Sequence, residues 1–165
     1  MGKWTTRSGP ALARLRQAIK DAETIQTRVG WFDTSHYPDG TPVAYVAAIQ
    51  EYGDPSHNIP PRSFMRTTQD EQKDRWFELM GKGIMQIPSG RQTVRSVMEL
   101  LGLQVEADVR KKITLIYDPK LQESTLRARA HKLGVTREQV STKPLNATGY
   151  MLATLTSITS EDKPK

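Results

Sequence analysis

The chain contains no cysteine among its 165 residues. This absence excludes disulfides, thiolate catalysis, iron–sulfur clusters and zinc sites with cysteine ligands. The sequence also has no run of ~18 consecutive apolar residues, so we expect no transmembrane helix. Its first residues lack the apolar segment of a secretory signal. Together these absences favour a protein that folds or assembles in a reducing cytoplasm.

Recognisable catalytic motifs are missing as well. The sequence holds no nucleophile elbow, no zinc-protease motif and no phosphate-binding glycine loop. Its three histidines are spaced unlike any metal-binding motif, and we interpret them as surface or capping residues. These histidines are His36, His57 and His131.

Four carboxylates near the first loops are the remaining candidates for chemistry. They are Asp33, Asp39, Glu51 and Asp54. Two or more carboxylates can hold a divalent cation for nuclease work, but solvated loop carboxylates are far commoner. We therefore predict no enzymatic activity, no cofactor and no metal site.

The chain carries a modest excess of positive charge. Lys and Arg total 24 and Asp and Glu total 18, which gives a net charge of +6. Such an excess can indicate nucleic acid, an acidic partner surface or only solubility. No block of five or six like charges occurs, so the sequence has no basic arm of the usual nucleic-acid-binding kind.

The hydrophobic pattern alternates between helical and strand-like periods. It predicts helices at 10–23 and 43–52, from Phe64 on, and at 91–116, 124–133 and 148–155. It predicts strands at 25–32 and 155–159, and an irregular connection over 135–144. Gly53 and Gly134 are expected to end helices, whereas Gly81 and Gly83 are expected to interrupt the helix that begins at Phe64.

These elements predict an α+β fold, with a small, mostly antiparallel sheet packed against one long helix and several short ones. We expect a single domain over residues 10–159. Residues 1–9 and 160–165 are polar, and we predict that they form flexible ends.

Leu126 to Val140 resembles a helix-turn-helix, with Ala130, Gly134 and Val140 at the expected offsets. That motif requires a second helix from Thr136 on, which would enter the major groove. Two nearby residues argue against it. Pro144 would cut the second helix short, and Lys143 would fall where a core residue should lie. A DNA-binding regulator that uses segment 125–142 remains the alternative function.

A proline-rich segment is the strongest candidate for an interaction site. Its prolines hold an extended backbone at low entropic cost, and its apolar and arginine side chains suit a protein–protein contact. The alternative is a rigid connector whose Phe64 and Met65 enter the core. The candidate interface residues are Ile59, Pro60, Pro61, Arg62, Phe64, Met65 and Arg66.

Two sequence elements resemble a known family. The first joins YVAAIQEYG (45–53) to IPPRSFMR (59–66), and the second joins STLRAR (124–129) to KPLNATGYML (143–152). Both resemble elements of the tail-completion and neck proteins of tailed bacteriophages, which include the minor tail protein Z family and related head–tail joining families. The predicted long helix lies between them, in the family's order. Ser63 and Ala147 depart from the family's usual Pro and Asp.

The resemblance implies a structural protein of the virion, located in the tail or neck and assembled in the host bacterial cytoplasm. Such proteins form homo-oligomeric rings, commonly six-fold, between the tail tube and the head–tail connector or adaptor. Genomic DNA would pass through the ring without sequence-specific binding. Because a ring uses a head-to-tail interface, each subunit would need two unlike complementary patches.

Overall fold

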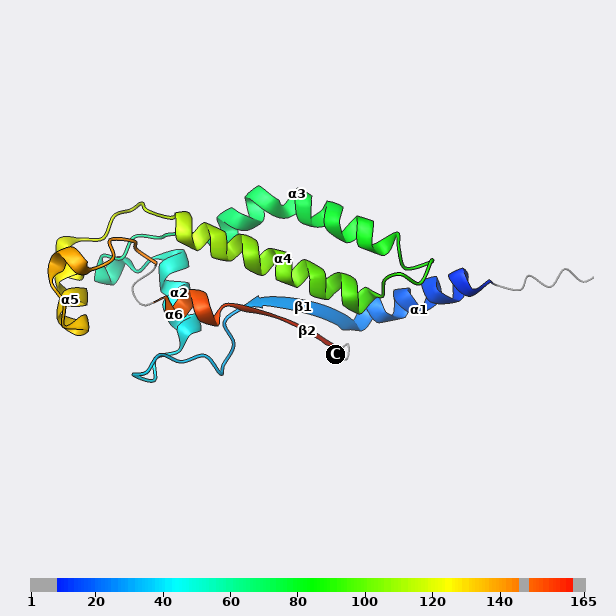
Figure 1. Cartoon of the computed structure of the whole chain (residues 1–165), viewed down its shortest axis with the longest axis horizontal. Coiled ribbons are helices and arrows are strands. Elements are labelled where there is room, and N and C mark those ends of the chain that lie inside the picture. The colour runs from blue at the N-terminus through cyan, green and yellow to red at the C-terminus, as the bar shows by residue number, and fades with distance from the viewer. Residues whose placement is uncertain (1–8, 146–148, 162–165) are drawn as a thin grey trace, which may run out of the picture. The chain divides into compact units, whose positions relative to one another are not determined.

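A computed structural model describes residues 9–145 and 149–161. Within these ranges the chain forms six α-helices and a two-stranded antiparallel sheet, which confirms the α+β class (Figure 1). None of these helices combines the length and apolarity needed to cross a bilayer. The elements are α1 (Pro10–Thr24), β1 (Ile25–Gly30), α2 (Val43–Tyr52), α3 (Met65–Ile84), α4 (Val94–Leu115), α5 (Glu123–Leu133), α6 (Tyr150–Thr154) and β2 (Thr156–Glu161), with 3-10 turns η1 (Pro55–His57) and η2 (Arg137–Gln139).

The predicted helices all form, and the long helix α4 has 22 residues. The predicted caps are confirmed, because Gly53 (φ 77°) follows α2 and Gly134 (φ 65°) follows α5. These positive φ values favour glycine because it has no Cβ.

Two boundary predictions were wrong. Strand β1 ends at Gly30, and Trp31 instead packs edge-on against Phe64, with ring centroids 5.7 Å apart. At the other end, Ser160 and Glu161 belong to strand β2 rather than to a polar tail, since pairing with β1 overrides their polarity. Residues 1–8 and 162–165 of the predicted flexible ends lie outside the described residues.

The chain divides into two compact units. Unit 1 contains the residues up to Val29, Lys73–Val105 and the residues from Ser157 on. Unit 2 contains Gly30–Gln72 and Glu106–Thr156. Helices α3 and α4 each pass from one unit into the other, α3 after Gln72 and α4 after Val105. The single domain predicted over 10–159 stays a prediction.

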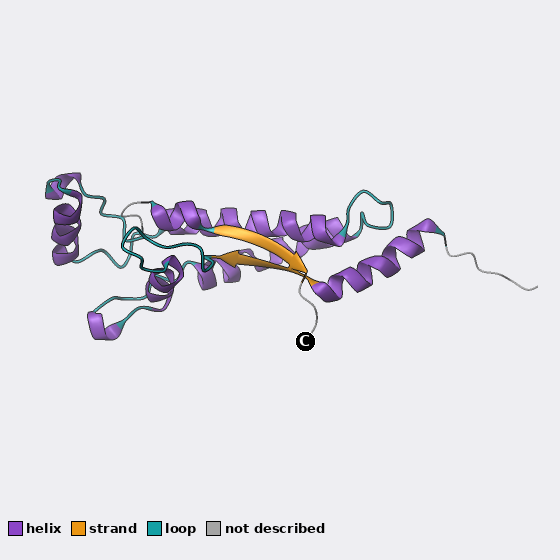
Figure 2. Cartoon of the chain, turned by 90° about the horizontal axis from the view of Figure 1, so that it is seen from below, coloured by secondary structure: helices purple, strands orange, loops and turns teal. Residues whose placement is uncertain are grey.

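In unit 1, β1 and β2 pair as a ribbon (Figure 2) that contacts α4. The Thr27 hydroxyl lies 2.8 Å from the Thr159 hydroxyl and donates to the Met98 carbonyl at 3.1 Å. Gly102 makes this contact possible, because a Cβ there would lie 2.6 Å from Cγ2 of Thr27.

Gly83 has the same role between α3 and α4. A Cβ at this position would lie 2.8 Å from Cγ2 of Val97. The prediction that Gly81 and Gly83 interrupt the helix was wrong, because α3 continues through both to Ile84. Close helix packing, rather than chain breaking, accounts for the glycine at position 83.

The core of unit 2 gathers α2, α6, the first turn of α3 and the second half of α4. Its fully buried side chains include Val43, Phe64, Val109, Ile113 and Leu155. A smaller cluster beside it joins α5 to the following turn through Leu126, Ala130 and Val140, with Leu121 packed against them.

Candidate interaction site

The proline-rich segment lies in unit 2, between α2 and α3, and folds back on the end of α2. A Cβ at Gly53 would lie 2.8 Å from the Pro61 nitrogen, so only glycine allows this approach. Asp54 and Ile59 exchange backbone hydrogen bonds of 2.8 and 2.9 Å, which close the intervening turn. The segment that follows therefore starts from a fixed point.

Asp54 caps this turn. Its carboxylate accepts hydrogen bonds from the Ser56 amide at 3.1 Å and from the Ser56 hydroxyl at 2.5 Å. Its second oxygen lies 2.6 Å from Nδ1 of His57. Hydrogen bonds from Ser56 and then His57 lower the pKa of Asp54. The hydrogen bonds of Asp54 and His57 described here thus stay within the loop.

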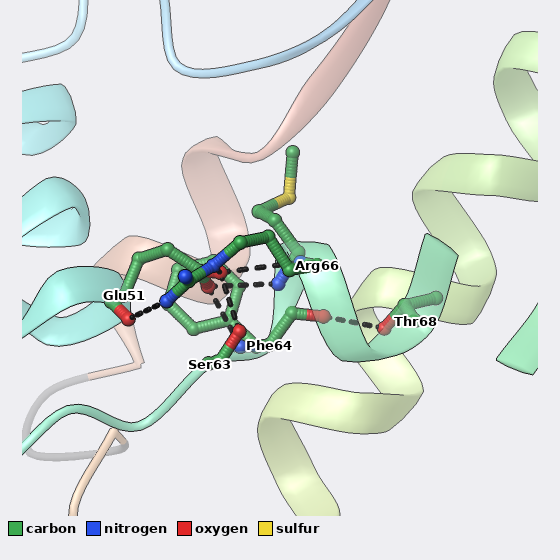
Figure 3. Close-up of polar contacts among 6 residues, drawn as sticks. Glu51, Ser63, Phe64, Arg66 and Thr68 are labelled. Carbon is green, nitrogen blue, oxygen red and sulfur yellow. Dashed lines mark hydrogen bonds and ion pairs between the residues drawn. The ribbon is translucent and has the colours of Figure 1, made fainter. Parts of the chain in front are cut away.

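Glu51 is the centre of the site. Although it lies on the last turn of α2, its side chain is buried and reaches the first turn of α3 (Figure 3). One carboxylate oxygen accepts from the Phe64 and Met65 amides at 2.7 and 2.9 Å. The other accepts from the Ser63 hydroxyl at 2.6 Å, and from the Arg66 amide and Nε at 3.2 and 2.9 Å. A single carboxylate therefore caps α3 from 12 or more residues away.

Burial by itself would raise the pKa of Glu51. Hydrogen bonds from Ser63, Met65 and Arg66 outweigh it, and the pKa lies below its usual value. The folded state therefore favours the carboxylate form, which is the form that accepts every one of these hydrogen bonds.

Arg62 forms a second link within unit 2. Its buried guanidinium donates from Nε to the Pro119 carbonyl at 2.9 Å and from Nη1 to Oε1 of Gln50 at 3.2 Å. A longer bond of 3.5 Å runs from Nη2 to the Lys120 carbonyl. Burial lowers the pKa of Arg62. The arginine thereby ties the proline-rich segment to the chain that follows α4.

These positions correct the predicted interface. Phe64 is fully buried and Arg62 is 5% exposed, so neither can contact a partner in this fold. Met65, Ile59 and Pro60 are half-buried, and Pro61 and Arg66 are exposed. Phe64 follows the alternative, that of a connector residue entering the core, and its amide donates to the buried Glu51 carboxylate.

The structure adds an exposed residue that the sequence did not single out. Tyr52, the last residue of α2, is 66% exposed, and the Arg66 guanidinium lies 4.6 Å from the centre of its ring. Tyr and Arg are enriched where proteins meet. We call Tyr52, Pro61 and Arg66 the Tyr52 surface. Pro61 and Arg66 belong to the predicted interface, and Tyr52 lies in the family-like element 45–53, directly before the helix-ending Gly53.

One side chain also joins the two halves of the second sequence element, 124–129 and 143–152. Arg129 on α5 donates to the carbonyls of Ser141, Lys143 and Pro144 at 3.1, 2.9 and 2.7 Å. Burial, and then the charge of Arg62, lower its pKa. A guanidinium supplies these several donors in fixed directions, which an ammonium group does not.

The two elements meet at a hollow of about 210 Å³ in unit 2. Val46 and Gln50 line it from the first element. Arg129, Pro144, Leu145, Tyr150 and Met151 line it from the second. Segments about 80 residues apart in sequence therefore form one local structure. Asn146, Ala147 and Thr148 of the second element lie outside the described residues.

The helix-turn-helix alternative does not have its second helix. Between Gly134 and Leu145 the chain forms only the three-residue turn η2, and Val140 is buried against Leu126 and Ala130. A recognition helix must reach into the major groove. The turn η2 is too short to do so, and the residue after it, Val140, is buried. Pro144 is buried and Lys143 lies over the Tyr117 ring at 5.3 Å.

The candidate carboxylates do not converge. Glu51 and Asp54 are engaged as described, Asp39 accepts from the Thr41 amide at 3.0 Å, and Asp33 is exposed. In the part of the chain that the structure describes, no three His, Asp or Glu side chains gather as metal ligands would. His36, His57 and His131 are all exposed.

Comparison of the chain with models of protein families, with curated protein sequences and with solved structures gave no match.

Proposed function

We propose that this protein is a structural subunit of a tailed-bacteriophage virion, located at the head–tail interface. In this role it completes the tail and joins the tail tube to the head connector as part of a homo-oligomeric ring, with genomic DNA passing through the lumen. It acts by assembly rather than by catalysis.

One observation carries the proposal: both phage-like sequence elements lie in unit 2, where residues of each line the same hollow. Glu51 joins the two halves of the first element, Arg129 joins the two halves of the second, and the elements line one hollow. The residues that resemble the family thus support a rigid local structure, as an assembly protein requires.

The exposed part of this structure is suited to a protein contact. The Glu51 cap fixes the position of Arg66 in the Tyr52 surface. Glu51 accepts a hydrogen bond from the Arg66 side chain, and the guanidinium of that side chain lies over the Tyr52 ring. A prearranged aromatic–arginine pair loses little side-chain entropy when it binds. We assign this surface to a neighbouring protein of the head–tail interface.

The test is electron microscopy of lysates from a phage that carries a stop codon in this gene. We expect DNA-filled heads beside separate or defective tails. Normal, joined particles would exclude the proposal.

Point variants then test the Tyr52 surface itself. Tyr52→Ala removes an exposed ring and should leave the subunit folded while reducing the yield of joined particles. Leu115→Ala is the matched control, since Leu115 is 58% exposed and lies at the end of α4. If both variants join heads to tails equally well, the Tyr52 surface has no role in joining.

A further inference from the structure

Helix α1 leaves most of its apolar side uncovered in unit 1. Ala18 is its one buried residue, whereas Leu12, Leu15 and Ile19 are 43%, 40% and 59% exposed. These three residues recur at helical spacing and form one stripe. Isolated helices of about this length are marginal in water. An uncovered stripe on such a helix therefore indicates a partner.

A hollow of about 340 Å³ lies beside this stripe. Apolar side chains line it throughout, and they come from α1, α3, α4 and the chain between them. Leu15 and Ile19 belong to both the stripe and the hollow, which Ile84 and Val97 also line. We call the stripe and the hollow together the α1 groove.

A second apolar surface of unit 1 lies on α4. From Val94 to Val105, the exposed residues of this helix are Glu99, Leu100 and Leu103. The two leucines are 51% and 58% exposed, and the spacing of the three residues puts them on one face. We call these three residues the α4 ridge. It is convex, since it is the outer face of a helix.

The charges of the two surfaces are opposite. Arg16 and Lys20 are exposed beside the stripe of the α1 groove, with Glu23 in the last turn of α1. Glu99 is the charged residue of the α4 ridge, and Arg95, one turn before it, is paired with Glu161. A concave, basic-edged apolar surface and a convex, acidic apolar surface on one chain complement each other.

We propose that the occupant of the α1 groove is the α4 ridge of a second copy of this chain. Because the surfaces are unlike, the contact runs head to tail, and each copy keeps one free groove and one free ridge. Leu100 and Leu103 fill the groove, and Glu99 faces Arg16 and Lys20. Repetition of this contact links successive copies into a row. Only the closure of that row into a ring rests on the proposed function.

Two variants and their mixture test the contact in the full-length protein. Ile19→Asp disables the groove, and Leu103→Asp disables the ridge. We expect the wild type to form species larger than dimers in analytical ultracentrifugation, and each variant alone to be monomeric. An equimolar mixture should give dimers and nothing larger, because one intact groove still meets one intact ridge. Tyr45→Asp, at an exposed residue of unit 2, should assemble as the wild type does.

A mixture that stays monomeric, or a variant that assembles like the wild type, would overturn the proposal. Circular dichroism shows whether each variant keeps the wild-type helix content.

Cross-linking gives a second measurement that does not depend on folding of the aspartate variants. Because the chain has no cysteine, Ile19→Cys mixed with Leu103→Cys should form an intermolecular disulfide on mild oxidation. Ile19→Cys mixed with Tyr45→Cys is the control. A wild type that stays monomeric together with no cross-link above the control would also overturn the inference.

The outcomes separate this inference from the proposed function. If the contact forms but phage without this protein assemble normally, the inference holds and the head–tail assignment fails. If phage without it are defective but groove and ridge variants assemble normally, the inference fails alone.

Discussion

Replacing Glu51 with Gln tests the buried cap of α3. Gln is almost the same size but has one acceptor oxygen in place of two. If that oxygen keeps the bonds from Ser63 and Arg66, the new amide group faces the Phe64 and Met65 N–H groups, which are donors as well. Each donor left without an acceptor costs about 1–3 kcal/mol when buried. Met65 is half-buried, so we expect a loss of about 2–4 kcal/mol in the free energy of unfolding.

Urea unfolding at neutral pH measures this loss. A small domain has about 5–15 kcal/mol in total, so the midpoint should fall clearly while the slope m stays the same. Glu138→Gln makes the same chemical change at an exposed carboxylate and should alter stability by no more than about 0.5 kcal/mol. If Glu51→Gln is as stable as this control, the cap does not stabilise α3 and the reasoning is wrong.

The pH dependence gives an independent check. Since the pKa of Glu51 is lower in the folded state, its contribution is complete above the unfolded-state pKa of about 4.3 and is lost as the pH falls through the folded-state pKa. The stability difference between the wild type and Glu51→Gln should therefore be constant near neutral pH and shrink in acid. A difference that grows on acidification would contradict the direction of the shift.

Three further predictions concern packing and surface charge. Gly102→Ala should lower the free energy of unfolding by about 1–3 kcal/mol, because its Cβ would overlap Thr27 and approach Ser157; equal stability in thermal unfolding would refute the close contact. Arg62→Lys should cost about 1–3 kcal/mol in urea unfolding, because one ammonium group cannot replace the guanidinium at Pro119 and its other acceptors; wild-type stability would show these bonds to be dispensable. Glu123→Gln weakens a two-bond surface pair with Arg137 and should lower the stability less than Gly102→Ala does; a loss as large as that of Gly102→Ala in thermal unfolding would contradict its surface character.

The sequence by itself determined the local elements. Sequence patterns predicted the positions of the six helices in the described part of the chain, and Gly53 and Gly134 marked two helix ends where φ is positive. These features depend on backbone preferences and on which side of an element is apolar, and both act within a few residues.

The role of Glu51 could not be predicted in this way. Its position at the end of an apolar helix predicts only a polar residue near solvent. The tight turn from Gly53 to Pro61 brings the start of α3 to this carboxylate, and burial there requires hydrogen bonds that a solvated glutamate does not need. The same turn buried Phe64, which sequence reasoning had considered as an exposed anchor.

Glycines show most directly what only the tertiary structure decided. The sequence predicts that Gly83 interrupts its helix, and helix propensity counts Gly102 as unfavourable as well. In the structure each is the point where another side chain, Val97 or Thr27, packs against the helix backbone. The sequence determined where helices form, whereas contacts between segments distant in sequence decided which helix faces meet, because those contacts depend on shape complementarity that no local pattern records.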